Sequence, residues 1–343
     1  MSDLKPIPAA GLPGAVCVTD YVAAGMGLDV ADALQAVIDC NPNRTIFFPD
    51  GEYLVSHPLR TPADPAKSVD LQLANFAVIR ATDDFTGGAV IALGGRDPYN
   101  TTLQAGSNYS LTGGVIDGNN IADGVSIDSG RETRVQNTAI KRTVIGLHIK
   151  YGANNGSSDA DIRDISITGN SAADSVGILA EGFDNTFTNV RIGYVRTGVV
   201  MRSAGNSLIN VHPLFEIGWD KYEGSCGFRE ECSNNLYIYC YSDQFQTAFE
   251  IIGNGRSVYD NCYAYWWSGE GGNCTGFRAR GDGFNAVATN LRIDFRKDTD
   301  NTMYSGPSTG SGVFSCLMVD EDLLNTDRTY RQFVQSVNGA LSG

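Results

Sequence analysis

One short pattern decides the fold of this chain, because it recurs with its apolar residues in register. The copies are Gly124-Val-Ser-Ile-Asp128, Gly146-Leu-His-Ile-Lys150, Gly177-Ile-Leu-Ala-Glu181, Gly198-Val-Val-Met-Arg202, Gly227-Phe-Arg-Glu-Glu231, Ala248-Phe-Glu-Ile-Ile252 and Gly276-Phe-Arg-Ala-Arg280. Their short alternation has the period of a β-strand. Successive copies begin 22, 31, 21, 29, 21 and 28 residues apart, so the repeat is a coil of about 21 residues that in places carries a longer loop.

Two further short strands accompany each copy. One precedes it and often follows an Asn or Asp, which tolerates tight-turn geometry. Examples are Asp164-Ile-Ser-Ile-Thr168, Asn189-Val-Arg-Ile-Gly193, Asn210-Val-His-Pro-Leu214 and Asn290-Leu-Arg-Ile-Asp294. The other follows the copy, as in Thr186-Phe-Thr and Ser207-Leu-Ile. Three strands in one coil are a rung of a solenoid, and the frame of a leucine-rich repeat is missing. The sequence predicts an all-β, right-handed parallel β-helix.

The two ends of the chain differ from the coils. A solenoid needs such caps, because an uncovered last rung exposes unpaired backbone N–H and C=O groups that can pair with another chain. Residues 29–39 have helical apolar spacing, with Asp29 as a plausible N-cap. Residues 327–337 suggest a second capping helix, and 296–312 a loop. We therefore expect one domain over 1–343, with a cap and first strand at 16–55, coils at 68–295, and a C-terminal loop and cap at 296–343.

Charge and composition exclude several functions. The net charge of −14 argues against nucleic acid and against an anionic membrane surface as partners. No secretory signal and no apolar run long enough to span a membrane is present, so we expect a cytoplasmic protein, or one assembled there into a larger particle. The eight cysteines lack metal-ligand spacing, so we expect free thiols, no metal and no other cofactor.

The first coils resemble the opening of pectate-lyase-like β-helix proteins, a group with rhamnogalacturonase, alginate-epimerase and phage tailspike relatives. The resemblance rests on Val18-Thr-Asp-Tyr21, Ala33-Leu-Gln-Ala-Val-Ile38, Ile46-Phe-Phe-Pro-Asp-Gly-Glu-Tyr-Leu-Val55 and Gly114-Val-Ile-Asp-Gly118. It implies a right-handed β-helix that acts on a carbohydrate, and trimers are common among such relatives. The motifs of polygalacturonases and the acidic cluster of calcium-dependent pectate lyases are absent.

Stacking the coils places outward side chains in two columns. One column alternates in sign, and we expect an exposed ion ladder from it: Asp128, Lys150, Glu181, Arg202 and Glu231. The other column ends in Arg229, Glu250 and Arg278. A carboxylate between two arginines stays ionised, which suits a structural salt bridge or substrate binding and makes Glu250 a poor general acid.

Two loop inserts mark the candidate site. Residues 216–224 and 266–272 leave from the same turn, so they flank the short coil between them, which carries Tyr237, Tyr239, Tyr241, Asp243 and Phe245. Aromatic faces with carboxylates between them suit a sugar. The candidate catalytic residues are Glu216, Asp220, Glu223, Asp243 and Glu270, with His212 as a proton carrier. The candidate substrate-binding residues are Trp219, Tyr241, Trp266, Trp267, Arg229 and Arg278.

Three functions fit these residues. The leading hypothesis is a glycoside hydrolase or glycosyl transferase that cleaves an oligo- or polysaccharide with two carboxylates. The first alternative is a lyase on a uronic-acid polymer, with His212, Tyr241 or Arg229 as the base, although the net negative charge does not favour a polyanion. The second is a non-catalytic glycan-binding or phage tail-type protein. Exposed aromatics also suit a subunit interface, so a homotrimer is an open alternative.

Overall fold

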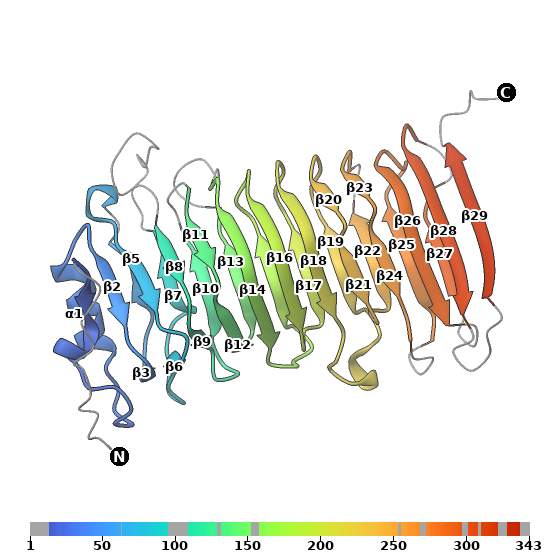
Figure 1. The fold of residues 1–343 in the computed structure, drawn as a ribbon. Helices are drawn as coiled ribbons and strands as arrows, with labels where there is room; N and C mark the ends of the chain where they lie inside the picture. The colour runs from blue at the N-terminus through green and yellow to red at the C-terminus, as the bar shows by residue number, and fades with distance from the viewer. Residues whose placement is uncertain are drawn as a thin grey trace, which may run out of the picture.

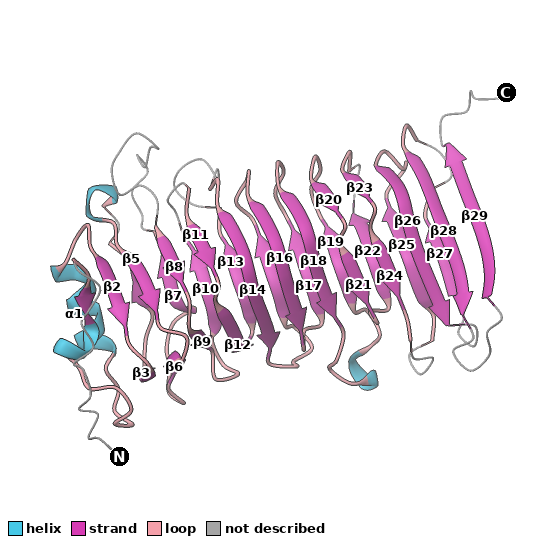
Figure 2. Ribbon diagram, viewed as in Figure 1, coloured by secondary structure: helices cyan, strands magenta, loops and turns pink. Residues whose placement is uncertain are grey.

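The predicted β-helix is what the computed structural model shows: parallel coils stacked side by side from one end of the molecule to the other (Figure 1). The structure describes residues 14–62, 64–94, 109–128, 132–151, 158–252, 255–267, 272–296, 301–307, 310–321 and 328–336. Strands dominate this part of the chain, and the helix α1 lies at the N-terminal end (Figure 2).

The strands form two sheets. Sheet B contains the glycine-led segments: β4 Leu59–Arg60, β7 Ala89–Leu93, β10 Asp123–Ile127, β13 Ile145–Ile149, β15 Val176–Ala180, β17 Thr197–Met201, β19 Cys226–Glu230, β22 Thr247–Ile252, β25 Cys274–Arg280 and β27 Asn301–Ser305. Their parallel pairing aligns Val125, Leu147, Ile178, Val199, Phe228, Phe249 and Phe277. The seven copies of the pattern are therefore consecutive rungs of one sheet.

Sheet A contains the other strands. They are β1 Val16–Cys17, β2 Thr45–Phe48, β3 Gly51–Val55, β5 Asp70–Leu73, β6 Ala77–Ala81, β8 Ser110–Thr112, β9 Val115–Asp117, β11 Arg134–Gln136, β12 Ala139–Thr143, β14 Asp161–Gly169, β16 Thr186–Gly193, β18 Ser207–Leu214, β20 Leu236–Ile238, β21 Tyr241–Asp243, β23 Val258–Asp260, β24 Tyr263–Tyr265, β26 Val287–Arg296, β28 Val313–Glu321 and β29 Arg328–Ser336. Short 3-10 helices lie at Val18–Asp20, Pro65–Lys67 and Trp219–Lys221.

Sheet A bends sharply once in each coil, at a residue with positive φ. These corner residues are Asn137, Asp164, Asn189, Asn210, Tyr239, Asn261 and Asn290, with φ between 52° and 56°. Asn and Asp visit this left-handed region most readily among residues with a side chain, which confirms the turn role predicted for them. The corner also shifts the in-and-out alternation by one residue. Tyr237 before the corner is therefore buried, whereas Tyr241 after it faces outward.

The glycine that opens each copy has no room for a side chain. A Cβ on Gly177 would lie 2.4 Å from Cγ2 of Ile192 and 2.5 Å from the carbonyl oxygen of Gly198. Gly124 and Gly146 face Ile140 and Ile167 in the same way. One copy opens with Ala248 in place of glycine. The residue that faces it in the same coil is Ala264, which pairs in register with Ile293, the residue that faces Gly276 in the next coil. The smaller Ala264 leaves space for the extra methyl.

The ends correct two predictions. Helix α1, Ala31–Cys40, confirms the N-terminal cap, and Asp29 accepts a hydrogen bond from the Ala31 N–H at 3.0 Å although Val30 is the flanking residue. The predicted C-terminal helix is wrong, because Arg328–Ser336 is a strand that pairs antiparallel with β28. Part of the predicted loop at 296–312 is also a strand, β27.

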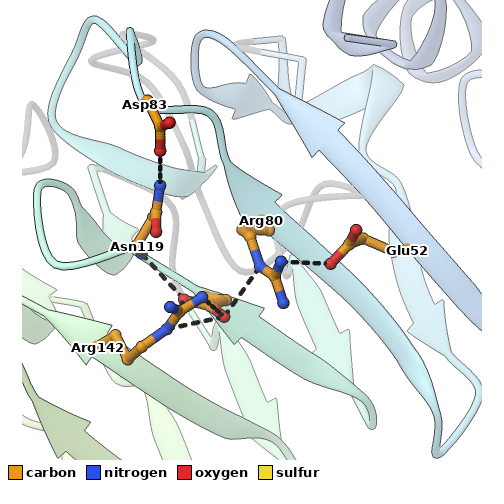
Figure 3. A network of polar contacts seen from close by, with 6 residues as sticks. Glu52, Arg80, Asp83, Asn119 and Arg142 are labelled. Atoms are coloured by element: carbon orange, nitrogen blue, oxygen red, sulfur yellow. Dashed lines mark hydrogen bonds and ion pairs between the residues drawn. The ribbon is translucent and has the colours of Figure 1, made fainter. Parts of the chain in front are cut away.

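A closed polar network holds the first coils together on the outer face of sheet A (Figure 3). The buried carboxylate of Asp117 accepts hydrogen bonds from Nε of Arg80 at 3.2 Å and from Nε of Arg142 at 2.9 Å. Arg80 also pairs with Glu52 at 2.6 Å, and Asn119 donates to Asp83 at 2.8 Å. Because the charges in this network already have partners, we interpret it as structural.

The predicted ion ladder on sheet B is also present. Lys150 pairs with Asp128 at 2.6 Å, and Arg202 pairs with Glu181 at 3.1 Å and Glu231 at 2.9 Å. The partners are partly exposed, so each pair contributes at most about 1 kcal/mol. This column is therefore scaffold. All eight cysteines are free, and Cys240 and Cys262 are small core residues as predicted.

The tight contact at Gly177 gives a test of the packing. Gly177→Ala should lower the free energy of unfolding by about 1–3 kcal/mol, because the new methyl overlaps both a side chain and a backbone carbonyl. Gly88→Ala is the matched control, since no heavy atom lies within 4 Å of its added Cβ, and it should change stability by less than about 0.5 kcal/mol. Urea unfolding measures both; equal effects would contradict this packing.

Candidate functional site

The candidate site is a groove on the outer face of sheet A, over strands β16 to β26. Its cavity is about 590 Å³. Its floor is a column of side chains that stack rung upon rung where the strands pair in register: Arg191, His212, Tyr241, Tyr263 and Arg292. Corner residues form one edge of the groove, with Asn210, Tyr239, Asn261 and Asn290. The corner brings these residues outward, because it reverses the alternation that would otherwise bury the column.

His212 and Tyr241 form the centre of this column. Their rings stack at a centroid distance of 4.1 Å with 17° between the planes. Nε2 of His212 is buried and lies 3.9 Å from Oδ2 of Asp243, to which the Tyr241 hydroxyl donates a hydrogen bond at 3.3 Å. Burial and then the Asp243 carboxylate raise the pKa of the Tyr241 hydroxyl. Tyr241 is therefore a neutral phenol that keeps its proton at neutral pH.

Tyr263 and Arg292 extend the column toward the C-terminal coils. The Tyr263 ring stacks on Tyr241 at 4.7 Å, and the Arg292 guanidinium lies 5.2 Å from the Tyr263 centroid, in cation–π contact. In the adjacent column, the buried carboxylate of Asp294 accepts hydrogen bonds from the Tyr263 hydroxyl at 2.7 Å and from Nε of Arg292 through its other oxygen at 2.9 Å. Asp294 thus orients both groups and is not itself part of the groove lining.

Arg191 is the cation at the other end of the column. Its Nη1 donates to the carbonyl oxygens of Val190 and Asn210 at 3.4 and 3.3 Å. Within the described part of the chain, no carboxylate lies within ion-pair distance of its guanidinium. Arg191 is exposed, so its charge is available to an anion in the groove.

Tyr239 is unusual among the corner residues. The other corners named above are Asn or Asp, whereas Tyr239 has φ 53° and a ring that is 66% exposed on the edge of the groove. A bulky residue in the left-handed region costs roughly 1–2 kcal/mol and buries little here in return. Tyr239 therefore presents an exposed ring at the edge of the groove from a strained backbone position.

The structure separates the other predicted site residues from this groove. Trp266 is 2% exposed, stacks on Phe295 and donates to the Phe245 carbonyl, so its assignment as a substrate-binding residue is wrong. Trp219, Glu216, Glu223 and Asp220 are exposed in the segment after β18, Trp267 is exposed beyond β24, and none of them lines the groove. Glu270 lies outside the described residues. Of the predicted site residues, the structure brings His212 and Tyr241 together, with Asp243 in the adjacent column.

Arg229 and Arg278 lie on sheet B and not in the groove. Both face Glu250, which is 2% exposed, with Nε of Arg229 at 2.9 Å from one carboxylate oxygen and Nη1 of Arg278 at 3.8 Å from the other. Arg280 adds a third contact at 2.8 Å. This confirms the predicted carboxylate between arginines. Placing the two arginines beside the aromatic residues was wrong, because the two sheets face different sides of the coil.

Sequence reasoning missed Arg191, Tyr239 as an edge residue, Tyr263, Arg292 and Asp294. The register of the strands after each corner Asn contained the signal, since Asn189-Val-Arg, Asn210-Val-His and Asn290-Leu-Arg place Arg191, His212 and Arg292 at the same step. Among the described residues, no group of three or more His, Cys, Asp or Glu side chains is arranged to hold a metal ion. No described helix is long and apolar enough to cross a membrane.

Comparison with known proteins gives structural matches and no sequence match. No family model matches the chain, and no curated protein matches it. A solved alginate lyase from Paenibacillus sp. str. FPU-7 is similar with a TM-score of 0.59 and 17% identity, over 80% of this chain and 95% of that one. ORF18 of Geobacillus virus E2 has a TM-score of 0.57 and 15% identity, over 93% of this chain. The bacteriophage Phi29 gene product 12 N-terminal fragment has a TM-score of 0.56 and 14% identity, over 86% of this chain.

The chain shares the right-handed parallel β-helix fold of these solved structures. It spans 63% of the Geobacillus virus chain and 60% of the Phi29 fragment. At these identities the likeness extends to the fold and not to a reaction.

The corner at Tyr239 gives a test of the strain. Tyr239→Asn should raise the free energy of unfolding by about 1 kcal/mol, because Asn adopts positive φ at much lower cost. Tyr239→Phe is the control; it keeps the strain and should leave stability unchanged. Denaturant unfolding compares the three proteins, and a less stable Asn variant would mean that the ring supports the fold.

Proposed function

We propose that the groove binds an acidic polysaccharide and that the protein is a polysaccharide lyase acting on uronic-acid residues. The observation that carries this proposal is the groove lining. Two arginines, a histidine, three tyrosines and three asparagines line it, and no described carboxylate does. Positive and aromatic groups suit an anionic sugar ring, whose carboxylate needs a cation and whose CH-rich face packs on flat side chains.

The two-carboxylate reaction of a glycoside hydrolase finds less support in the groove. That reaction needs two carboxyl groups on either side of the scissile bond. Asp243 and Asp294 stand in the adjacent column outside the groove lining, and Asp294 is already engaged by Arg292 and Tyr263. The net charge of −14 counts against a polyanion at long range, but Arg191, which has no carboxylate within ion-pair distance among the described residues, attracts an anion at contact distance.

The column supplies each group that a β-elimination needs. Arg191 neutralises the carboxylate of the uronic acid, which makes the proton on the adjacent carbon more acidic. His212, with Nε2 facing Asp243, has Nδ1 left to take that proton. The electron pair of the broken C–H bond forms the new double bond, and the glycosidic C–O bond breaks. Tyr241 gives its phenol proton to the leaving oxygen and regains one from solvent.

The similarity to a solved alginate lyase is in keeping with this proposal, because alginate is the acidic polysaccharide named for that protein. A second candidate is a virion protein that binds the glycan without cleaving it. It is supported by the likeness to ORF18 of Geobacillus virus E2 and to the Phi29 gene product 12 fragment. In that case we propose a homotrimer, which sedimentation would detect.

Incubation with alginate, polygalacturonate and a neutral glucan tests the reaction. A lyase produces an unsaturated uronate with ultraviolet absorbance from one of the acidic polymers and nothing from the glucan. Tyr241→Phe should lower the rate about 10²- to 10⁴-fold while affinity changes little, because the variant keeps the ring stack and loses only the hydroxyl. Tyr194→Phe, at an exposed tyrosine outside the groove, should leave the rate unchanged.

The other outcomes separate the hypotheses. New reducing ends without ultraviolet absorbance would contradict the lyase and indicate hydrolysis. Binding of an acidic polymer with no product would support the virion protein. Arg191→Gln should weaken the binding of acidic oligomers and remove much of its salt dependence, since the ion pair between the guanidinium and the sugar carboxylate is lost. Binding of neither acidic polymer would overturn the proposed function.

A further inference from the structure

A second groove continues the first along the axis of the β-helix. Its cavity is about 540 Å³, and it lies on the outer face of sheet A over strands β9 to β16. The two grooves share Arg191, and both follow the line of corner residues, with Asn137 and Asn189 in the second groove and Asn210 in the first. They are therefore two halves of one track along the same bend in the sheet.

The floor of the second groove is the same column of residues in earlier coils. Val115, Ala139 and Ser166 pair in register and lead directly to Arg191. They are small, so the floor is open where the first groove has stacked rings. With about 4.8 Å between rungs, the second groove covers about 14 Å and the first about 19 Å. A linear chain that extends past Arg191 meets this surface without a bend.

The second groove offers amides and hydroxyls in place of cations. Asn137 and Asn189 stand at its corners, and Ser166 is exposed on its floor. Apart from Arg191 at the junction, the charged residue in its lining is Asp164, whose carboxylate accepts a hydrogen bond from Asn189 at 2.6 Å. Such a surface pairs with sugar hydroxyls and repels a sugar carboxylate that points at Asp164.

We propose that the second groove is an extension subsite for the same polysaccharide, which it holds through sugar hydroxyls and not through carboxylates. This inference rests on the proposed function, because the first groove must bind uronate residues of the same polymer. The polymer then runs parallel to the helix axis, with its carboxylate at Arg191 and its further residues over Ser166 and Ala139. Affinity has a salt-dependent part from the first groove and a salt-independent part from the second.

The experiment is a titration of oligouronates, from dimer to octamer, into the wild-type protein and two tryptophan variants. Ser166→Trp blocks the floor of the second groove, where Ala139 leaves space for the ring. Ser207→Trp makes the same change on β18 outside both grooves and is the matched control. Both are outward positions, and circular dichroism checks that each variant folds.

We expect the octamer to bind the wild type and Ser207→Trp at least about tenfold more tightly than the dimer does, a difference of about 1.4 kcal/mol. Ser166→Trp should lose the part of that gain that appears beyond the tetramer, which already fills the first groove. Raising the salt concentration should weaken dimer and tetramer binding and leave the octamer-to-tetramer ratio unchanged.

Three results would overturn the inference, and they are distinguishable. If the dimer and octamer bind the wild type equally, or Ser166→Trp retains the full gain, the second groove holds no sugar while the proposed function stands. If the gain in affinity with oligomer length falls steeply as the salt concentration rises, the second groove binds sugar carboxylates. If no oligomer binds any of the proteins, the proposed function fails and the extension subsite with it.

Discussion

The corner that each coil turns in sheet A is the constraint on which the site depends. Parallel strands pair in register only when every coil bends at the same step, and the bend requires one residue with positive φ. Asn and Asp fulfil this at least cost, and their side chains also bond from coil to coil, as Asn210 does to Asn189 at 3.2 Å. Because the bend repeats, it forms a continuous track on the outside of the sheet.

The outer face of sheet A serves as scaffold at one end and, in an adjacent column, as a site further along. In the N-terminal coils one outward column contains Arg80 and Asp117, whose charges are satisfied within the network of Figure 3. In the later coils the adjacent column contains His212, Tyr241 and Tyr263, which stack on one another and leave polar atoms toward the groove. A single architecture therefore carries both roles, and the identity of the outward residue in each coil decides which one it has.

The fold and the ladders were accessible from the sequence because they depend on period and register. Gly177 and its equivalents repeat for a steric reason, and the ion ladder follows from their alignment. The site was only partly accessible. The corner between β20 and β21 shifts the alternation, so a simple period of two placed Tyr237 and Tyr241 on the same face, whereas the structure buries Tyr237 and turns Tyr241 outward.

Two wrong predictions have the same physical origin: in each case a partner within the fold takes the group that the sequence assigned elsewhere. Trp266 looked like a loop residue for a ligand, but the end of the coil needs a large ring to pack on Phe295. Residues 327–337 have helical apolar spacing, yet the last rung has a free backbone edge, and β29 pairs with it in antiparallel fashion. Loop carboxylates such as Glu216 were predicted to be catalytic because of their chemistry. The groove is lined instead by residues of the strands and their corners.

The central claim is that the outer groove of sheet A binds an acidic glycan through the column from Arg191 to Arg292. A crystal structure of the Tyr241→Phe variant soaked with an oligouronate tests it most directly. The account predicts a sugar chain parallel to the helix axis, with one carboxylate bonded to the guanidinium of Arg191 and a ring on Tyr263. A sugar bound over Arg229 and Arg278 on sheet B, with the groove empty, would contradict it.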